Sequence, residues 1–492
     1  MRVCAAQARP THLRRILQNI NVSRSSDFPL MNAFQRFAAR LFFGSSSVFE
    51  NANNSPRRAR VPGAAPRDAC KDMPTPVRSE LVRRSRYLVK NSGFLREIVS
   101  SMALYAVGDG IRPQAQSDDA EFNKRAEELF ASWARKPEVT GRFNLTQCLR
   151  LICRAIDVDG EIFVLKTAQS GRPKIQLIET HRVASEERDN VIDGIRINAQ
   201  GRPTAYGIVT DSGTTSFINA QQVIHVFEPE SPSQLRGIPS LQHSINHLLD
   251  ENELLALEKH AVKSNADITR VLTTDDADAD TGFALNPSET GTDAAAVQAI
   301  VGGKVVRLNV GETLTPFESQ RPSPTFTGFL DHLNRDCALG LLPYEFAADS
   351  SKIGGAGVRL IVGKADRRFS ARQDTLIEQF LTPIWYYIIG TAIDSGELPA
   401  VKNWPRVTFV TPRRVTVDAG REAQQNREDI KAGLKTLSDH FAELGADFRE
   451  ELRTRAEEMS AIRDIAREYN LDARDLYASF IQQNQPNNDN TV

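Results

Sequence analysis

The sequence predicts a helix-rich α+β protein of about three structural units. Its 492 residues are 25% charged, which is typical of globular proteins, and 40% hydrophobic, which is a little low. The length nevertheless gives ample capacity for a core. A helical pattern begins near residue 78, and alternating apolar and polar residues then predict strands between 161 and 229. Apolar residues at three- and four-residue steps predict a long helix over 238–267.

Residues 1–77 form the first element, a flexible basic arm. The first 90 residues carry 17 Lys/Arg and 5 Asp/Glu, although the whole chain has a net charge of only −1. Residues 45–74 hold few large apolar side chains, so they cannot bury enough surface to fold alone. Contact with a polyanion, contact with partner subunits and a merely solvated terminus all remain open.

The next stretch, 78–237, places helices first and antiparallel strands second. After the first helical segment, Gly108 and Gly110 end the pattern, and further helices are expected at 121–135 and 145–155. The expected strands are EIFVLK, KIQLIE, GIRIN, TAYGIV and VIHVFEP, with Gly and Asn at the turns.

Two helices then bracket an acidic insert. Residues 271–303 contain no Lys or Arg, and their carboxylates include Asp275, Asp276, Asp278 and Asp280. The strand candidates KVVRLN and ETLTPFE follow, and a second helix is expected at 324–340. An acidic surface would repel DNA and let it slide, because phosphate contacts dominate nucleic-acid affinity. Composition alone favours an ordinary antiparallel helix pair with a solvated loop.

The remaining elements are a small-residue loop and helices. SSKIGGAG, residues 350–357, is small and flexible, and a helix over 358–382 is expected to stop at Pro383. The segment RVTFV predicts a strand. Helices are expected from about 421 to 480, with breaks near Gly445 and Asn470, followed by a disordered tail at 481–492.

Two patterns suggest metal sites, and both are incomplete. His243 and His247 lie one helical turn apart, but a zinc-protease pattern needs Glu where Ser244 stands. Asp157, Asp159 and Glu161 have the spacing of a calcium loop, but Ile162 and Ala168 occupy its sixth and twelfth positions. A turn before a strand is the better interpretation of the acidic triplet.

No other pattern points to catalysis. There is no GxxxxGK[ST] phosphate loop and no GxSxG elbow, so no catalytic residue, metal or cofactor is predicted. The five cysteines are scattered without a CxxC pair, which indicates free thiols in a reducing compartment, with Cys148 and Cys153 buried. The longest apolar run, 383–393, is about half of a bilayer span, so no membrane association is expected.

One segment, RSRYLVKNSGFLREIVSSMALYAVGDGIRPQ, bears arginines and an asparagine on a predicted helix that is followed by the turn VGDGI. It resembles the corresponding helix and "vGtGI" turn of the lambda-type family of tailed-bacteriophage portal proteins. FNKRAEELFASW, DGEIFVLK, IQLIETHRV, GIRINAQGRPTAYGIV and QVIHVFEPESPSQLRGIPSL follow in the family's order. LGLLPYEFAADSSKIGGAGVRLI and DIKAGLKTLSDHFAELGADFREEL continue the resemblance, which runs from about Arg36 to Leu471. Gly355, Ala356 and Gly357 stand where the family tends to have a Ser-Ser pair.

The resemblance implies a portal fold assembled as a closed ring, usually of twelve subunits. By similarity the parts are the wing at 78–237, the first stem helix at 238–267, the clip at 268–322, the second stem helix at 323–341, the wing return at 342–419 and the helical crown at 420–480. A tunnel loop at 350–357 would face DNA through Ser350, Ser351, Lys352, Gly354 and Gly355, with Lys352 contacting phosphate. The acidic residues Asp275, Asp276, Asp278 and Asp280 would lie on the clip.

The implied function is a channel at one capsid vertex for packaging and ejecting double-stranded DNA. The implied partners are other copies of the chain, DNA, the terminase large subunit, the major capsid and scaffold proteins, and the head-completion or tail-connector proteins. The protein would be made in the host cytoplasm and reside in the virion. The alternatives are an intracellular metal-dependent hydrolase using His243 and His247, and a nucleic-acid-binding scaffold using the basic arm.

Overall fold

The computed structural model describes residues 68–184, 190–272, 304–307, 324–351, 353–417, 419–444, 446, 448–472 and 476. The chain divides into two compact units, Met1–Pro66 and Arg67–Val492, and every described residue belongs to the second. The basic arm at 1–77 therefore lies almost wholly outside the described residues.

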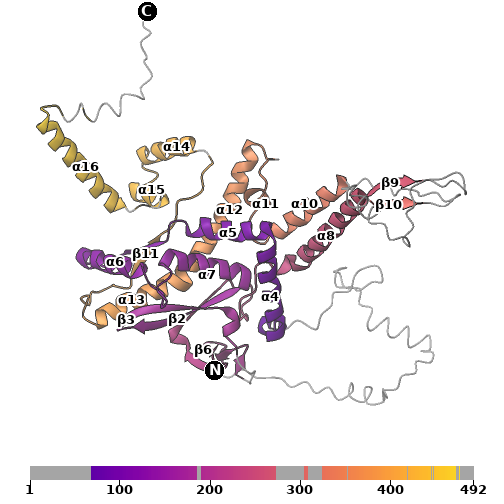
Figure 1. Cartoon of the computed structure of the whole chain (residues 1–492). Helices are drawn as coiled ribbons and strands as arrows, with labels where there is room; N and C mark the ends of the chain where they lie inside the picture. The colour runs from indigo at the N-terminus through magenta and orange to yellow at the C-terminus, as the bar shows by residue number, and fades with distance from the viewer. Residues whose placement is uncertain are drawn as a thin grey trace, which may run out of the picture. The chain divides into compact units, whose positions relative to one another are not determined.

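The second unit is a helix-rich α+β structure, as predicted, and most of its strands pair in antiparallel fashion (Figure 1). The helices before the sheets are α3 (Ala69–Asp72), α4 (Thr75–Asn91), α5 (Gly93–Val107), α6 (Ala120–Ala134) and α7 (Leu145–Asp159). The later helices are α8 (Ile245–Asp267), α10 (Pro324–Ala338), α11 (Tyr344–Ala347), α12 (Gly355–Leu376), α13 (Thr382–Asp394), α14 (Ala419–Lys431), α15 (Leu437–Glu443) and α16 (Phe448–Glu468).

Two antiparallel sheets follow α7. The first has the order β3-β2-β8 and consists of β2 (Glu161–Gln169), β3 (Arg172–Ile178) and β8 (Val223–Phe227). The second has the order β4-β5-β6-β7 and consists of β4 (Val191–Ile192), β5 (Ile195–Ile197), β6 (Pro203–Val209) and β7 (Thr215–Asn219). The sequence predicted β2, β3, β5, β6 and β8 but not β4 or β7. β4 has only two residues, and β7 is largely exposed, so neither carries a strong pattern.

Two further strand pairs join distant segments. β1 (Arg112–Ala115) pairs in antiparallel fashion with β11 (Val407–Val410), the strand predicted at RVTFV. β9 (Ile268–Leu272) pairs in parallel with β10 (Lys304–Arg307), which falls within the predicted KVVRLN strand. The candidate strand ETLTPFE lies outside the described residues.

Three apolar clusters hold these elements together. The largest joins α5, α6, α7, β2, α12 and α13 around Trp385, which is fully buried and lies with its ring 5.5 Å from that of Phe130. The second joins α4, α5, α8 and α10 through Leu88, Leu95 and Leu248. The third lies where the two sheets meet, with Phe163 against Tyr206. Cys148, Cys153 and Cys337 are buried free thiols, as predicted for the first two, and burial raises the pKa of each to about 12.

The helix predicted at 238–267 begins later, at Ile245, after a short 3₁₀ turn over Gln242–Ser244. The segment before it is bound to the α7–β2 turn. The Gly237 amide donates to Glu161 Oε2 at 2.7 Å, and the Ser240 amide donates to the Asp157 carbonyl at 3.1 Å. These amides therefore serve tertiary contacts rather than a helix.

The expected stop at Pro383 is wrong. α12 starts at Gly355, passes into a π-helical turn over Ile377–Leu381, and continues as α13 from Thr382. Pro383 lies in the first turn of α13, where the local change in helical winding accommodates the missing N–H.

The close approach of Gly237 to Gly160 gives a stability test. A Cβ on Gly237 would lie 2.1 Å from the Gly160 carbonyl oxygen, which is backbone and cannot rotate away. We expect Gly237→Ala to lower the free energy of unfolding by about 3 kcal/mol or more. Gly363→Ala is the matched control, because open space surrounds Gly363 in the middle of α12. This control should raise the stability by about 0.5–1 kcal/mol in urea unfolding. Equal effects of the two variants would contradict the close packing at Gly237.

Candidate functional site

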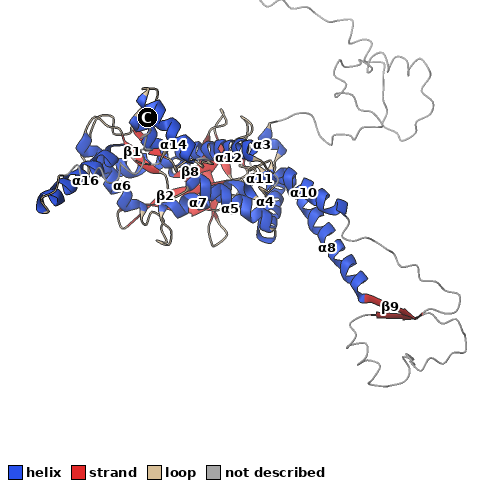
Figure 2. Ribbon diagram, turned by 90° about the horizontal axis from the view of Figure 1, so that it is seen from above, coloured by secondary structure: helices blue, strands red, loops and turns tan. Residues whose placement is uncertain are grey.

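α8 and α10 form a packed helix pair (Figure 2). Leu248 of α8 shares a buried cluster with Cys337 at the end of α10, so the two helices run in opposite directions. Further along the pair, Asn334 donates to Glu251 at 3.3 Å, and burial raises the pKa of Glu251 despite this bond. Leu257, Val262 and Phe329 remain exposed. The pair therefore leaves apolar side chains without cover in a single chain.

The two histidines of the metal hypothesis lie at the base of this pair. A Cβ on Gly340 would lie 2.2 Å from His243 Cε1, so the imidazole fills the space that the glycine leaves open. His247 Nε2 lies 3.9 Å from Asp336 Oδ2 in a half-exposed contact. Among the described residues, no group of three or more His, Cys, Asp or Glu side chains is arranged to hold a metal. The geometry therefore gives the metal-dependent hydrolase no positive support.

Each carboxylate of the acidic triplet binds a different arginine. Asp157 and Asp159 lie in the last turn of α7, and Glu161 opens β2. Asp159 accepts two hydrogen bonds of 2.7 Å from Arg86 of α4. Asp157 accepts one of 2.7 Å from Arg372 of α12. The triplet thus ties α4 and α12 to the junction of α7 and β2, which agrees with a structural interpretation rather than a calcium loop.

Glu161 is the most fully bonded of the three. It is completely buried and accepts hydrogen bonds from Arg236, His225 and the Gly237 amide, at 2.5 to 2.9 Å, and from the Thr180 hydroxyl at 2.5 Å. Burial by itself would raise the pKa of Glu161, but the charge of Arg236 and the bonds it receives hold that pKa well below its ordinary value. Glu161 is therefore an ionised structural carboxylate.

The pKa of Asp157 is shifted in the opposite direction to that of Glu161. Its Oδ2 is buried without a hydrogen-bond partner, and desolvation raises its pKa even though Arg372 is close. Arg372 also donates to Glu228 at 2.7 Å, so its charge does not depend on Asp157 alone.

The candidate tunnel loop connects α11 to α12. The described loop residues Ser350, Ser351 and Gly354 are exposed, and the Ser351 amide donates to Asp349 Oδ1 at 2.9 Å. The observed loop is shorter than the predicted one at 350–357, because Gly355 already belongs to α12. Open space surrounds Gly354 and Gly355, so no packing contact requires a glycine at either position. Lys352 lies outside the described residues.

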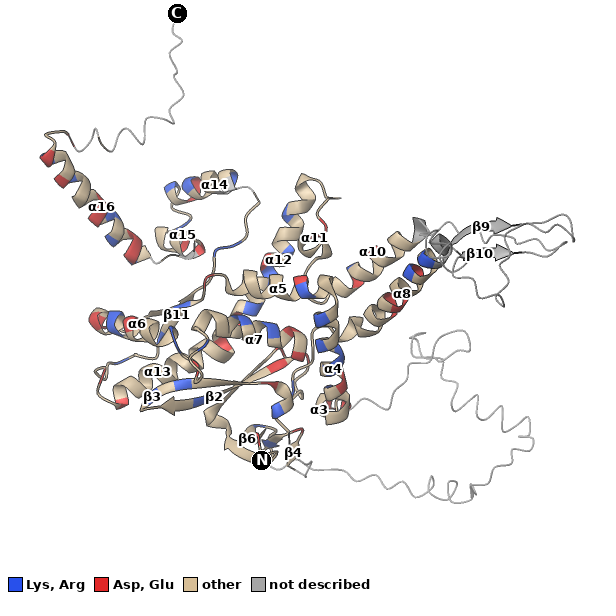
Figure 3. Ribbon diagram, viewed as in Figure 1, with Lys and Arg blue, Asp and Glu red and all other residues tan. Residues whose placement is uncertain are grey.

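A cationic face on the helix that follows this loop was not predicted from the sequence (Figure 3). Lys364, Arg367 and Arg368 of α12 are exposed and lie at three- and four-residue steps, so they share one side of the helix. The buried Arg372 faces the core instead. The sequence does carry a signal for this face, namely the three- and four-residue spacing of these cations within the helix predicted at 358–382.

The acidic residues assigned to the clip, Asp275, Asp276, Asp278 and Asp280, lie outside the described residues. The strands that flank them, β9 and β10, are described and pair with each other. No helix in the described part of the chain is long and apolar enough to cross a membrane.

The described architecture is that of a helix-rich α+β protein with an antiparallel helix pair inserted after two sheets. The family description "Phage portal protein, lambda family" matches residues 56–373. Because this match covers well over half of the chain, the protein belongs to the lambda family of phage portal proteins. The predicted family and the portal function are thereby confirmed.

Solved structures give weaker similarities. Chains described as "Neck of native GTA particle computed with C12 symmetry" and "Neck of empty GTA particle computed with C6 symmetry" are both 14% identical, with TM-scores of 0.46 and 0.43. The first comparison covers 77% of this chain and 95% of the other, and the second covers 75% and 93%. These TM-scores are too low to carry an argument about fold or function. No curated protein sequence matches the chain.

Glu161 and Asp157 give a matched pair of charge-to-amide tests. We expect Glu161→Gln to lower the free energy of unfolding by about 3–5 kcal/mol at neutral pH, because the new NH₂ group would face donors and leave Arg236 partly unpaired. Asp157→Asn should lower it by only about 1–2 kcal/mol, since Arg372 keeps Glu228. Urea unfolding measures both free energies. Equal losses in the two variants would contradict the inference that Glu161 is bonded more completely than Asp157.

The ionised state of Glu161 predicts that the free energy of unfolding depends on pH. The folded-state pKa of Glu161 is depressed, so its stabilisation is full above the unfolded-state pKa of about 4.3 and disappears as the pH falls through the folded value. The gap between the wild-type protein and Glu161→Gln should therefore narrow in acid. A gap that stayed constant down to the acid-unfolding limit would show that Glu161 is not held ionised.

Proposed function

We propose that this portal protein assembles as a closed ring of twelve copies at one capsid vertex, through which double-stranded DNA is packaged and ejected. The observation that carries the proposal is membership of the lambda portal family over residues 56–373. The exposed Leu257, Val262 and Phe329 on the α8–α10 pair support it, because neighbouring copies would cover them. A closed ring needs two different surfaces on each subunit.

The parts of the portal follow the chain in this proposal. The wing comprises 78–237 and returns at 342–419, the stem helices are 238–267 and 323–341, the clip is 268–322, and the crown is 420–480. The antiparallel α8–α10 pair supports the stem assignment, with the helix proper starting at Ile245. The paired strands β9 and β10 at the far ends of these helices support a clip built between them.

The DNA-facing surface in this proposal combines the tunnel loop with α12. Ser350, Ser351, Lys352, Gly354 and Gly355 supply a loop of small residues, and Lys364, Arg367 and Arg368 supply an exposed cationic face on the helix that follows. Lysine and arginine side chains neutralise DNA phosphates without reading the base sequence, which suits a channel that must pass any sequence.

The proposed partners bind at the two ends of the ring. The terminase large subunit would dock at the clip through the acidic insert that includes Asp275, Asp276, Asp278 and Asp280, and head-completion or tail-connector proteins would later replace it. The major capsid and scaffold proteins would surround the ring in the virion. The protein acts as a structural conduit in this proposal, and the terminase supplies the energy of translocation.

Native mass determination tests the assembly. Twelve copies of the 54.6 kDa chain should give a particle of about 655 kDa, with a central hole in negative-stain images. The purified ring should show no ATPase activity of its own. Intrinsic turnover abolished by a point substitution in this chain would overturn the structural role, and a stable monomer that never forms rings with scaffold and capsid would overturn the assembly.

Salt-dependent DNA binding tests the cationic face. Replacing Lys364, Arg367 and Arg368 by glutamine should weaken the binding of the ring to duplex DNA. It should also reduce the slope of log affinity against log salt, by about 0.9 for each phosphate that the variant no longer neutralises. Three exposed arginines of α16 replaced by glutamine (Arg449, Arg453 and Arg463) form the matched control and should leave the slope unchanged. An unchanged slope in the α12 variant would remove this face from the channel.

A further inference from the structure

A glycine turn at the end of α5 lies against the segment that follows β11. Gly108 ends α5 with φ +49°, and a Cβ there would lie 2.7 Å from the Pro412 ring. Gly110 has φ +119°, and a Cβ there would meet Thr146 Oγ1 at 2.7 Å. Both positions therefore need glycine, since other residues rarely adopt these angles and would also collide with their neighbours.

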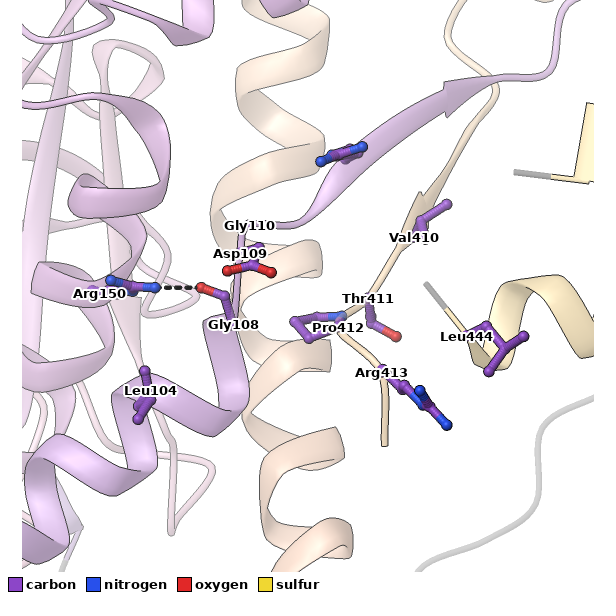
Figure 4. Close-up of a pocket in the computed structure, with 11 residues that line it drawn as sticks. Leu104, Gly108, Asp109, Gly110, Arg150, Val410, Thr411, Pro412, Arg413 and Leu444 are labelled. Atoms are coloured by element: carbon purple, nitrogen blue, oxygen red, sulfur yellow. Dashed lines mark hydrogen bonds between the residues drawn. The ribbon is translucent and has the colours of Figure 1, made fainter. Parts of the chain in front are cut away.

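This turn brings three arginines from distant parts of the chain to one hollow of about 330 Å³. Arg112 follows the turn in β1 and pairs with Val410 of β11, and Arg413 follows β11 three residues after Val410. Both arginines line the hollow. Arg150 comes from α7, and its Nη2 donates to the Gly108 carbonyl at 2.6 Å (Figure 4). The hollow exists because the β1–β11 pair and the α5–α7 contact meet at the turn.

The hollow has an excess of positive charge. Within the described residues, no ion pair involves Arg112, Arg150 or Arg413, and the buried Arg150 Nε has no hydrogen-bond partner. Asp109 is the acidic residue that lines the hollow, so three guanidinium groups and one carboxylate leave a formal charge of +2. Arg112, Arg413 and Asp109 are exposed, so an ion from solution can reach them.

We propose that this hollow binds a phosphate monoester, with Arg150 at the floor and Arg112 and Arg413 at the rim. A phosphate monoester carries a charge of about −1.5 to −2 at neutral pH, which matches the excess charge of the hollow, whereas each phosphodiester of DNA carries only one. Arginine presents a planar fork of donors that suits phosphate oxygens.

The size and lining of the hollow favour a small phosphorylated molecule over duplex DNA. Its volume is at the lower end of small-molecule sites, and it exceeds what a phosphate group alone would fill. Leu104, Val410 and Leu444 line it beside the arginines and would contact the organic part of such a molecule. This site is separate from the cationic face of α12 and does not depend on ring formation.

Calorimetric titration of the full chain with inorganic phosphate, at constant ionic strength, tests the site. We expect binding that Arg112→Gln and Arg413→Gln each weaken by about tenfold, because each removes one charged donor. Both side chains are exposed, so neither variant should affect folding. Arg96→Gln, a change at an exposed arginine of α5 outside the hollow, is the matched control and should bind phosphate like the wild-type protein.

Asp109→Asn supplies a test of opposite sign. Removing this carboxylate should strengthen phosphate binding by about three- to tenfold, since it removes the repulsive charge in the hollow. If the turn had only a structural role, Asp109→Asn would not increase the affinity for phosphate. Unchanged phosphate affinity in the Asp109 variant and in both arginine variants would overturn the proposal.

Two further ligands distinguish the source of the phosphate. Adenosine monophosphate should compete with inorganic phosphate and bind more tightly, because its organic part reaches the apolar lining. A short duplex with 5′-hydroxyl ends carries phosphodiesters alone and should not compete. Competition by this duplex, but not by the monophosphate, would overturn the proposal in favour of a DNA-backbone contact. These outcomes are independent of the ring, so they do not decide the proposed channel function.

Discussion

The buried ion pair between Glu161 and Arg236 is the contact on which the arrangement of the unit depends. Both side chains are almost fully shielded from water, and such a pair is tolerated only when the remaining donors and acceptors are satisfied. Arg236 also donates to the carbonyls of Val183 and Thr180, and Glu161 accepts the Gly237 amide. The pair therefore joins the start of β2, the 3₁₀ turn over Thr180–Arg182 and the chain that leads into α8.

Neighbouring ion pairs extend this arrangement to helices far apart in the sequence. Arg86 ties α4 to Asp159, and Arg372 ties α12 to Asp157, so helices almost 300 residues apart in sequence are fastened within one α7–β2 turn. This geometry fixes where the α8–α10 pair leaves the body, since Ser240 is bonded to the same turn.

Local patterns predicted most elements, because helices and half-buried strands repeat with their own periods. They failed where a tertiary contact decided the outcome. Ile238 and Leu241 continue the apolar spacing of the helix, yet the amides of Gly237 and Ser240 bind Glu161 and Asp157, residues about 80 positions earlier. Pro383 is a local stop signal that the π-helical turn before it overrides. The acidic triplet was predicted to be a turn before a strand, whereas Asp157 and Asp159 lie in the last turn of α7 and Glu161 opens β2. Its three arginine partners lie too far away in sequence to be inferred from spacing.

The arginines show why charge patterns reveal so little about function in a single sequence. Arg236 and Arg372 are buried structural ties, whereas Lys364, Arg367 and Arg368 face solvent on one side of α12, and nothing in residue type separates these two groups. Burial removes the first group from any contact with a ligand, because their donors are already used. The cations that can meet a polyanion are those that the fold leaves exposed, so the surface charge of the protein follows from packing and not from the nearly neutral total charge of the chain.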